Sequence, residues 1–387
     1  MVKRVKSYSL SRDVETPKNT GFQYIHYGDI HKKVANIIDL KSNLPNIQPG
    51  NYELLKTGDL ILADASEDYQ GIATPAIVYE DLPYKLVAGL HTIALRPESK
   101  RVDSLFLYYL INSQVFRKHG YRVGSGMKVF GISATNILKF EYVYPTIVEQ
   151  TQIGNFFKQL DETIAFQQQE LDTLKQTKQG FLQKMFPKEG ESLPEIRFPG
   201  FSGEWEAKCL GEISESYSGG TPSVDNKTFY GGDIPFIRSA EINSKTTEIY
   251  ITEEGFNSSS TKMVRVGDIL YALYGATSGE VGISKINGAI NQAVLAIKPK
   301  RGYDSYFLIQ WLKNQKSSII NTYLQGGQGN LSGSIVKKLI LKIPFDEKEQ
   351  TEIGHFFKQL DETIALHEQE LDILKQTKKA FLQKMFV

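Results

Sequence analysis

The chain has 387 residues, of which 41% are hydrophobic and 23% are charged, and its formal net charge is +1. This balance is typical of a globular protein of two or three domains, and it excludes a disordered chain or a uniformly basic nucleic-acid-binding protein. The single cysteine, Cys209, rules out a disulfide framework or a cysteine-based metal site within one chain.

No targeting or membrane segment is expected. The N-terminal sequence lacks the apolar core of about 7–15 residues that a signal peptide needs. No stretch approaches the roughly 18 apolar residues that span a bilayer. We therefore expect a cytoplasmic protein that contacts no membrane.

Residues 1–148 form a first globular body, in which strand-like segments precede a helix. Clusters of Pro, Gly and Asn separate short runs rich in β-branched and aromatic residues, which predicts strands. The predicted strands are Phe22–Gly28, Gly58–Asp64, Pro75–Glu80 and His91–Pro97. The aromatic run Ser104–Gly120 predicts a helix, and a last strand-like run leads into Pro145.

A long helix is predicted for Glu149–Phe186, and the same sequence returns at Glu349–Phe386. The two stretches lack proline and are rich in Leu, Glu, Gln and Lys, which favour helices. Of their 38 aligned positions, 8 differ and 30 are identical. The protein therefore consists of two similar halves that end in the same helix. At about 1.5 Å per residue, each helix would be roughly 57 Å long.

Apolar residues recur along both helices with the alternating spacing of a coiled-coil seam. The seam residues are Ile153, Phe157, Leu160, Ile164, Leu171, Leu174 and Phe181 in the first copy, and Ile353, Phe357, Leu360, Ile364, Leu371, Leu374 and Phe381 in the second. Each helix could pack on its own body, or the two could pack on each other, most simply antiparallel. Four seam positions are polar, and they could fix the register of the helix pair or lie at its solvent-exposed edge. They are Gln167, His367, Lys178 and Lys378.

The second body repeats the order of the first with little shared sequence. Its matching segments are Ile234–Ile242, Arg265–Gly275, Ala293–Pro299 and the helical Asp304–Gln315. Two bodies with divergent sequences on a repeated helix suggest two different ligands. The first body lacks a counterpart of the segment FPGFSGEWEAKCLGEIS. The stretch that leads into this body is therefore expected to be either shortened or built differently.

Two polar, glycine-rich loops occupy matched positions at Gly124–Ser133 and Gly326–Ser334. Glycine permits close backbone approach, and Ser, Asn, Gln, Arg and Lys supply the groups that contact base edges and phosphates. A second matched pair is Ala63–Pro75 and Leu273–Gly282. A mobile surface loop without a ligand is the alternative interpretation of these segments.

Catalytic signatures are missing from the sequence. It contains no G-x-x-x-x-G-K-[ST] loop for a nucleoside triphosphate and no Asn/Asp-Pro-Pro-aromatic stretch. The glycines of Gly124–Ser133 lack the strand, helix and distant acid of a dinucleotide site. The six histidines show no metal-ligand spacing. The carboxylate pairs Asp161-Glu162 and Asp361-Glu362 are expected on a solvated outer helix face.

These features together resemble the DNA-specificity subunit of type I restriction-modification systems. The resemblance is carried by the repeated helix, by the linker Leu193–Trp205, and by the motifs GGTPS (Gly219–Ser223), YGGDIPFI (Tyr230–Ile237), VGDILYALYGATSGEVGI (Val266–Ile283) and QGGQGNLSGSIVKKLILKIP (Gln325–Pro344). It implies an α+β chain of two target recognition domains, which are mixed α/β globules. Two long antiparallel helices forming a coiled coil would separate them, with pseudo-two-fold symmetry.

The resemblance divides the chain into four parts. They are a recognition domain at 1–148, a spacer helix at 149–186, a linker and second recognition domain at 187–348, and a C-terminal spacer helix at 349–387. The shortened start departs from the family pattern, and this departure bears on the ability of the first domain to recognise DNA. The implied DNA contacts are Tyr27, Arg122, Ser125, Lys128, Arg238, Tyr274, Thr277, Ser278, Gln325, Gln328, Asn330 and Ser332.

The resemblance also implies a non-catalytic DNA reader with no cofactor or metal of its own. Each recognition domain would read one half of a bipartite, asymmetric site in double-stranded DNA, and the helices would set the spacer between the halves. Two modification subunits carrying S-adenosylmethionine would methylate adenine at N6. Two restriction subunits would use ATP and Mg. The alternatives are a coiled-coil adaptor that binds proteins and a self-sufficient nuclease or methyltransferase.

Overall fold

The computed structural model describes residues 1–34, 36–126, 128–324 and 330–387. The chain divides into two compact units, one formed by Met1–Gln169 with Gln369–Val387 and the other by Glu170–Glu368. Each unit therefore contains one globular body and parts of both long helices. Among the described residues, no helix is long and apolar enough to cross a membrane.

The first unit contains two larger sheets and one two-stranded sheet, in which β11 (Phe130–Gly131) pairs with β7 (Ala65–Ser66). Five strands hydrogen-bond in the order β1-β10-β6-β8-β4, and four more in the order β2-β5-β3-β9. The strands of the first sheet are β1 (Val2–Val5), β10 (Thr92–Pro97), β6 (Leu60–Ala63), β8 (Pro75–Val78) and β4 (Ile37–Ile38). Those of the second are β2 (Glu15–Thr16), β5 (Asn46–Ile47), β3 (Phe22–Ile25) and β9 (Lys85–Ala88). All four predicted strands of this body are confirmed.

Two expectations for the first body are wrong. The predicted helix Ser104–Gly120 is two helices, α2 (Ser104–Asn112) and α3 (Gln114–Val123). They are interrupted at Ser113, whose extended backbone (φ −72°, ψ 159°) cannot continue a helix. The run before Pro145 is not a strand, because no neighbouring strand supplies a ladder of hydrogen bonds. The short helices α1 (Tyr27–His31) and α4 (Ala134–Leu138) complete this body.

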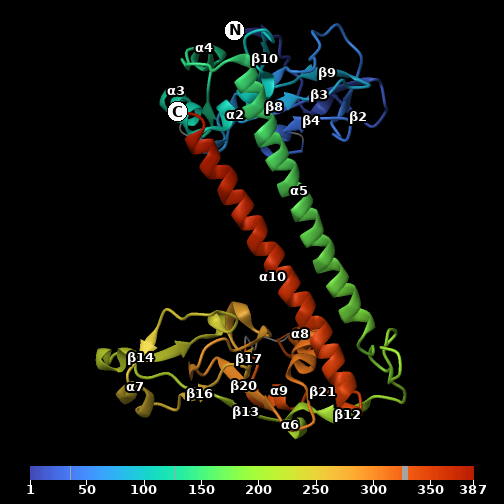
Figure 1. Ribbon diagram of the computed structural model, residues 1–387, viewed down its shortest axis with the longest axis vertical. Helices are drawn as coiled ribbons and strands as arrows, with labels where there is room; N and C mark the ends of the chain where they lie inside the picture. The colour runs from blue at the N-terminus through green and yellow to red at the C-terminus, as the bar shows by residue number, and fades with distance from the viewer. Residues whose placement is uncertain (35, 127, 325–329) are drawn as a thin grey trace. The chain divides into compact units, whose positions relative to one another are not determined.

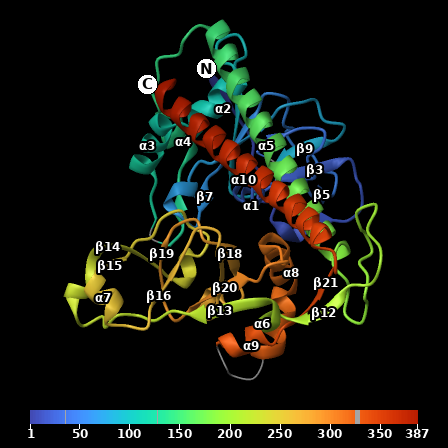
Figure 2. The same ribbon diagram turned by 60° about the horizontal axis from the view of Figure 1, so that its bottom comes forward.

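The second unit repeats the pattern of the first. Its sheet β13-β20-β17-β18 has the same order as β1-β10-β6-β8. These strands are β13 (Ser214–Ser218), β20 (Val294–Pro299), β17 (Ile269–Ala272) and β18 (Val281–Ile283). A second sheet has the order β15-β14-β19-β16, with β15 (Tyr250–Ile251), β14 (Tyr230–Ile237), β19 (Gly288–Ile290) and β16 (Lys262–Val264). The helix α8 (Ser305–Leu324) lies against the first of these sheets (Figure 2).

A third sheet in this unit has no counterpart in the first. It pairs β12 (Glu206–Cys209) with β21 (Ile340–Ile343), and β12 belongs to the segment that has no counterpart in the first body. The short helices α6 (Leu210–Ile213), α7 (Glu253–Asn257) and α9 (Gly333–Lys337) complete the second body.

The repeated stretches form the long helices α5 (Ile147–Lys184) and α10 (Glu347–Lys384). In the first unit the start of α5 and the end of α10 lie side by side and antiparallel (Figure 1), because Phe156 contacts Phe381 and Phe157 contacts Phe386. In the second unit the end of α5 pairs in the same way with the start of α10, because Phe181 contacts Phe356. The antiparallel pairing expected from the sequence is therefore present in each unit.

The seam residues form the more buried stripe of both helices. Phe157, Leu171, Ile353, Phe357 and Leu371 are buried. All but one of the other predicted seam residues are half-buried, as are Gln167, His367, Lys178 and Lys378. The exception is Phe381, which is 38% exposed. Because the stripe is apolar and partly covered, its burial stabilises the helix pair.

Each long helix is docked on its body by a buried glutamine. The side-chain oxygen of Gln150 accepts a hydrogen bond from the Asp103 N–H at 3.0 Å, and its amide donates to the Pro145 carbonyl at 2.9 Å. Gln350 makes the same two contacts with Asp304 and Pro344, at 3.2 and 3.1 Å. One turn on, a Cβ at Gly154 would lie 2.9 Å from the Phe106 nitrogen, so this approach requires glycine.

Candidate nucleic-acid interface

The two polar segments of the first body are neighbours in space. β11 (Phe130–Gly131) pairs antiparallel with β7 (Ala65–Ser66). The Ile132 N–H donates to the Asp64 carbonyl at 2.9 Å. The loops Gly124–Ser133 and Ala63–Pro75, which are far apart in the sequence, therefore form one continuous surface.

The tip of the first loop is closed by its own backbone. Ser125 and Gly131 exchange two hydrogen bonds, at 2.9 and 2.7 Å. Ser125 and Lys128 are exposed on this tip, and Arg122 is exposed on the last turn of α3 just before it. These three predicted contact residues thus lie together at the surface, where two cations are available for phosphates.

Aromatic rings that the sequence analysis did not single out complete this surface. The ring of Tyr69 stacks on Tyr121 at 5.1 Å and meets Phe130 edge-on, also at 5.1 Å. Arg117 donates to the carbonyl of Ile72 at 2.6 Å, and its guanidinium lies 5.5 Å from the Tyr121 ring. The signal in the sequence was the alternation of aromatic and basic residues along α3. Such rings with nearby cations can stack on bases and hold the backbone beside them.

Tyr27 lies at the start of α1, among three histidine rings. Its ring centre is 4.4 Å from His26, 5.9 Å from His31 and 5.3 Å from His91. His31 Nε2 lies 2.8 Å from the Ala65 carbonyl, which places this cluster beside β7. Burial lowers the pKa of His26 below its ordinary value, and the charge of Arg12 lowers it further. The ring of His26 caps α1 by accepting the Gly28 N–H at 3.1 Å.

The second unit brings its own two polar segments together in the same way. Tyr274 and Asn330 form an isolated β-bridge. The Leu331 N–H donates to the Leu273 carbonyl at 3.0 Å. Asn330 is exposed beside the 3-10 turn Gly275–Thr277. Gln325 and Gln328 lie outside the described residues.

Three predicted contact residues of the second unit hold the loop backbone. Ser278 is buried and donates to the Leu273 carbonyl at 3.1 Å. Thr277 donates to the Tyr274 carbonyl at 3.5 Å, and Ser332 caps α9 by accepting the Ile335 N–H at 3.2 Å. In this conformation their hydroxyl groups shape the loops.

The guanidinium of Arg238 is occupied by two carboxylates. It binds Glu241 through two nitrogens, both at 3.0 Å, and Glu248 at 2.7 Å. Partial burial opposes ionisation of Glu241, but the hydrogen bonds from Arg238 and from two backbone N–H groups outweigh it and lower its pKa to about 2. Arg238 therefore has a structural partner that the sequence did not reveal.

The carboxylates Asp161 and Asp361 are not on a purely solvated face, and that expectation is wrong. Lys378 donates to Asp161, and Lys178 donates to Asp361. Tyr109 also donates to Asp161 at 2.8 Å. Asp161 and Asp361 are thus paired across the two long helices, while their neighbours Glu162 and Glu362 are exposed.

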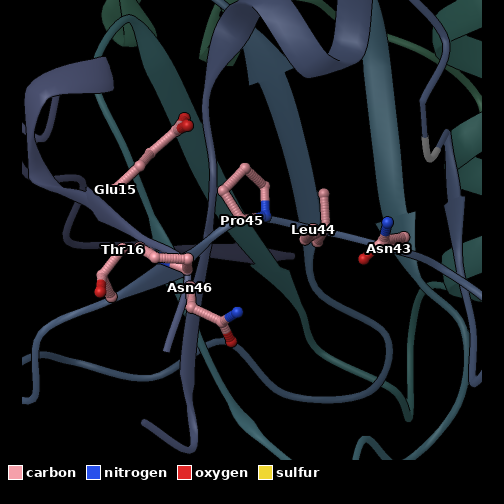
Figure 3. A pocket seen from close by; sticks show the side chains of 7 residues that line it. Glu15, Thr16, Asn43, Leu44, Pro45 and Asn46 are labelled. Carbon is pink, nitrogen blue, oxygen red and sulfur yellow. The ribbon is translucent and has the colours of Figure 1, made fainter. Parts of the chain in front are cut away.

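One hollow of the first unit lies away from the two loops. Figure 3 shows a hollow beside β2 and β5 that is lined by Glu15, Thr16 and the segment 43–46. Glu15 accepts hydrogen bonds there from Arg12 and Tyr24, at 2.7 and 2.8 Å. In the part of the chain that the structure describes, no three His, Cys, Asp or Glu side chains are grouped to hold a metal ion.

Comparison with known proteins assigns the family. The family model for the type I restriction modification DNA specificity domain matches residues 9–176 and again 202–376. The MjaX specificity subunit of Methanocaldococcus jannaschii is 25% identical over 84% of this chain and 76% of its own length. The EcoR124I/EcoR124II specificity subunit of Escherichia coli is 30% identical over 41% of each chain.

A solved structure has the same fold. The crystal structure of a type I restriction-modification S subunit from M. genitalium matches 100% of this chain and 93% of its own, with a TM-score of 0.65 and 14% sequence identity. The chain belongs to the type I restriction-modification DNA specificity family, and it carries two such domains. It is a specificity subunit with two recognition domains. Specificity subunits are not themselves catalytic and carry no cofactor of their own.

Proposed function

We propose that each unit reads one half of a split, asymmetric site in double-stranded DNA through its pair of adjoining loops. The observation that carries this proposal is that both units bring the same two segments together, β7 with β11 and Tyr274 with Asn330, although their side chains differ. A shared framework with different exposed groups suits two different half-sites. The recognition domains are then residues 1–148 and 187–348.

In the first unit, the exposed cations Arg122 and Lys128 hold phosphates beside the Tyr69–Tyr121 stack. Ser125 contacts the DNA beside them, and Tyr27 does so from the neighbouring cluster on α1. In the second unit, Asn330 and Tyr274 make the corresponding contacts, with Gln325 and Gln328 from the same loop. Arg238 contacts DNA only after exchanging a carboxylate for a phosphate.

The long helices, residues 149–186 and 349–387, set the distance between the half-sites and dock two modification subunits. Those subunits carry S-adenosylmethionine and methylate adenine at N6. Two restriction subunits add ATP- and Mg-dependent cleavage. The near-identity of the helices supports this role, since two identical partners require two identical surfaces.

Methylome sequencing of cells that express this chain with its modification subunit tests the proposal. We expect N6-methyladenine in a motif with two defined halves and a constant spacer. Arg122→Ala with Lys128→Ala removes two phosphate contacts, so the purified complex should lose affinity for all sequences and its salt slope should fall by about two.

A matched control is Lys100→Ala, which removes an exposed charge from a turn away from the loops. Asn330→Ala should relax specificity in one half-site only. Site-specific methylation that is unchanged in both loop variants would contradict the assignment of these loops. A complex that binds DNA without site preference would contradict the proposed function itself.

A further inference from the structure

Asp64 joins three segments of the first unit at one point. Its N–H donates to the His91 carbonyl at 3.1 Å, and its own carbonyl accepts the Ile132 N–H at 2.9 Å. The side chains of the first pair also meet, since His91 Nδ1 lies 3.1 Å from Asp64 Oδ1. The turn before β10 is therefore attached to the two polar loops that we propose as the DNA-contacting surface.

The second unit has the same backbone connections with different side chains. The Leu273 N–H donates to the Ala293 carbonyl at 2.8 Å, and the Leu273 carbonyl accepts the Leu331 N–H at 3.0 Å. Leu273 and Ala293 are 1% and 8% exposed, whereas the side chains of Asp64 and His91 are 31% and 49% exposed. One framework thus carries a buried apolar pair in the second unit and an exposed, ionisable pair in the first.

The contacts of His91 place a proton on its Nδ1. A carboxylate can only accept hydrogen bonds, so the contact with Asp64 requires Nδ1–H. The backbone of His91 is left-handed, with φ +55°, a conformation that histidine and asparagine adopt more readily than most residues. The ring of Tyr27 meets it edge-on at 5.3 Å. The Nε2 of His91 has no hydrogen-bond partner among the described residues, so it remains available to a ligand.

The two neighbouring histidines hold main-chain groups instead. His26 is buried and accepts the Gly28 N–H at 3.1 Å, and His31 Nε2 lies 2.8 Å from the Ala65 carbonyl. Both rings are therefore occupied by the local fold. His91 is the member of this histidine cluster whose side chain is exposed.

The ionisable groups that face His91 come from two places in the fold. Asp64, after β6, supplies a carboxylate. At the start of α1 the facing groups are Tyr27 and His26, and burial of His26, followed by the charge of Arg12, lowers the pKa of that ring. Most groups that DNA presents to proteins are acceptors, above all phosphate oxygens. Only an imidazolium, which donates from both nitrogens, can satisfy Asp64 and such an acceptor together.

We propose that His91 is a further DNA-contacting residue of the first unit and that it binds as an imidazolium. Nδ1–H donates to Asp64, and Nε2–H donates to an acceptor of the first half-site, either a phosphate oxygen or guanine N7. Asp64 is then a positioning residue that orients the ring. The inference rests on the proposed function, because it assigns a role within the same surface. DNA binding by the first unit takes up a proton at this position, whereas the second unit, with Ala293 there, does not.

The pH dependence of DNA affinity tests this assignment in the complex of the chain with its modification subunit, on a duplex that carries its methylated motif. At constant ionic strength we expect the affinity to rise about fivefold from pH 8 to pH 6. His91→Asn suits the left-handed backbone and should leave a rise below about twofold. Asp64→Asn should also reduce the rise. The matched control is His355→Asn, an exposed position of α10 where the first repeat has Asn155, and it should keep the full rise.

Substituting 7-deazaguanine for each guanine of the first half distinguishes the two acceptors. Loss of the rise identifies guanine N7, and its retention identifies a phosphate oxygen, so either result supports the contact.

A full rise in both His91→Asn and Asp64→Asn would overturn the proposal. Affinity that falls toward pH 6 in the wild type would also overturn it, because a neutral ring accepts a hydrogen bond at Nε2 instead of donating one. In both cases site-specific binding would remain, and the proposed function with it. Binding without site preference at every pH would contradict the proposed function itself.

Discussion

Lys178 on α5 donates a hydrogen bond to Asp361 on α10. The same contact occurs with the roles of the helices exchanged, where Lys378 on α10 donates to Asp161 on α5. Each residue differs from its counterpart by 200 positions, so one repeated sequence supplies both halves of both pairs. A single antiparallel alignment of the two repeated sequences accounts for both contacts.

Replacing the two lysines should have unequal effects. Without Lys378, the one partner that Asp161 retains among the described residues is the Tyr109 hydroxyl. Without Lys178, Asp361 retains Gln310 and Lys313, at 3.2 and 3.4 Å. We expect Lys378→Met to lower the free energy of unfolding by about 2 kcal/mol and Lys178→Met by about 1 kcal/mol, because an unpaired, partly buried carboxylate is costly.

Urea unfolding can separate the two effects. Both tryptophans, Trp205 and Trp311, lie in the second unit, so tryptophan fluorescence reports that unit and circular dichroism reports both. Lys178→Met should shift the fluorescence transition, and Lys378→Met should shift only the transition seen by circular dichroism. A shift of the fluorescence transition by Lys378→Met as large as that seen by circular dichroism would show that its pair does not act within the first unit alone.

Arg238→Ala should destabilise the second unit. The change leaves Glu241 without its bidentate partner, and we expect a loss of about 2 kcal/mol from the tryptophan-monitored transition. The pKa of Glu241 is lowered in the folded protein to about 2. Its contribution to stability is therefore complete above its ordinary value of about 4.5 and is lost as the pH falls toward 2.

Acid titration of the variant supplies the control. The wild-type chain should lose stability between pH 4.5 and 2 more steeply than Arg238→Ala, in which the pKa of Glu241 lies closer to its ordinary value. If the variant has unchanged stability and acid sensitivity but binds DNA less tightly, Arg238 is a DNA contact after all.

Lengthening both helices should change the spacer of the recognised site. Seven residues inserted after Gln169 and again after Gln369 preserve the apolar period and add about 10.5 Å. At 3.4 Å per base step this corresponds to about three base pairs. Methylome sequencing should show the same two half-sites with the longer spacer. Insertion into α5 alone should abolish methylation, because the two lysine–aspartate pairs then require different registers; altered half-sites would contradict the role of the helices.

Much of the architecture was predictable because its signals are local. The seam follows from a short apolar period, and the long helices begin and end within two residues of the repeated stretches. The predictions from sequence were wrong where the local structure depends on a segment that is distant in the sequence and adjacent in the fold. The run before Pro145 has the composition of a strand, yet only the matching run Ile340–Ile343 forms one, because β12 lies beside it.

The sequence by itself therefore determined that the chain is a duplication, where its helices lie, and which two segments of each body are polar. The tertiary structure decided which of these groups meet. Lys178 and Asp361 are 183 residues apart, and the two loops of each body are separated by more than 40 residues. Such pairings depend on how strands and helices pack, because the sequence around a charge or a loop does not indicate which distant residue will contact it in the folded protein. That is why Asp161 looked like a solvated carboxylate and Arg238 like a free cation until their neighbours were known.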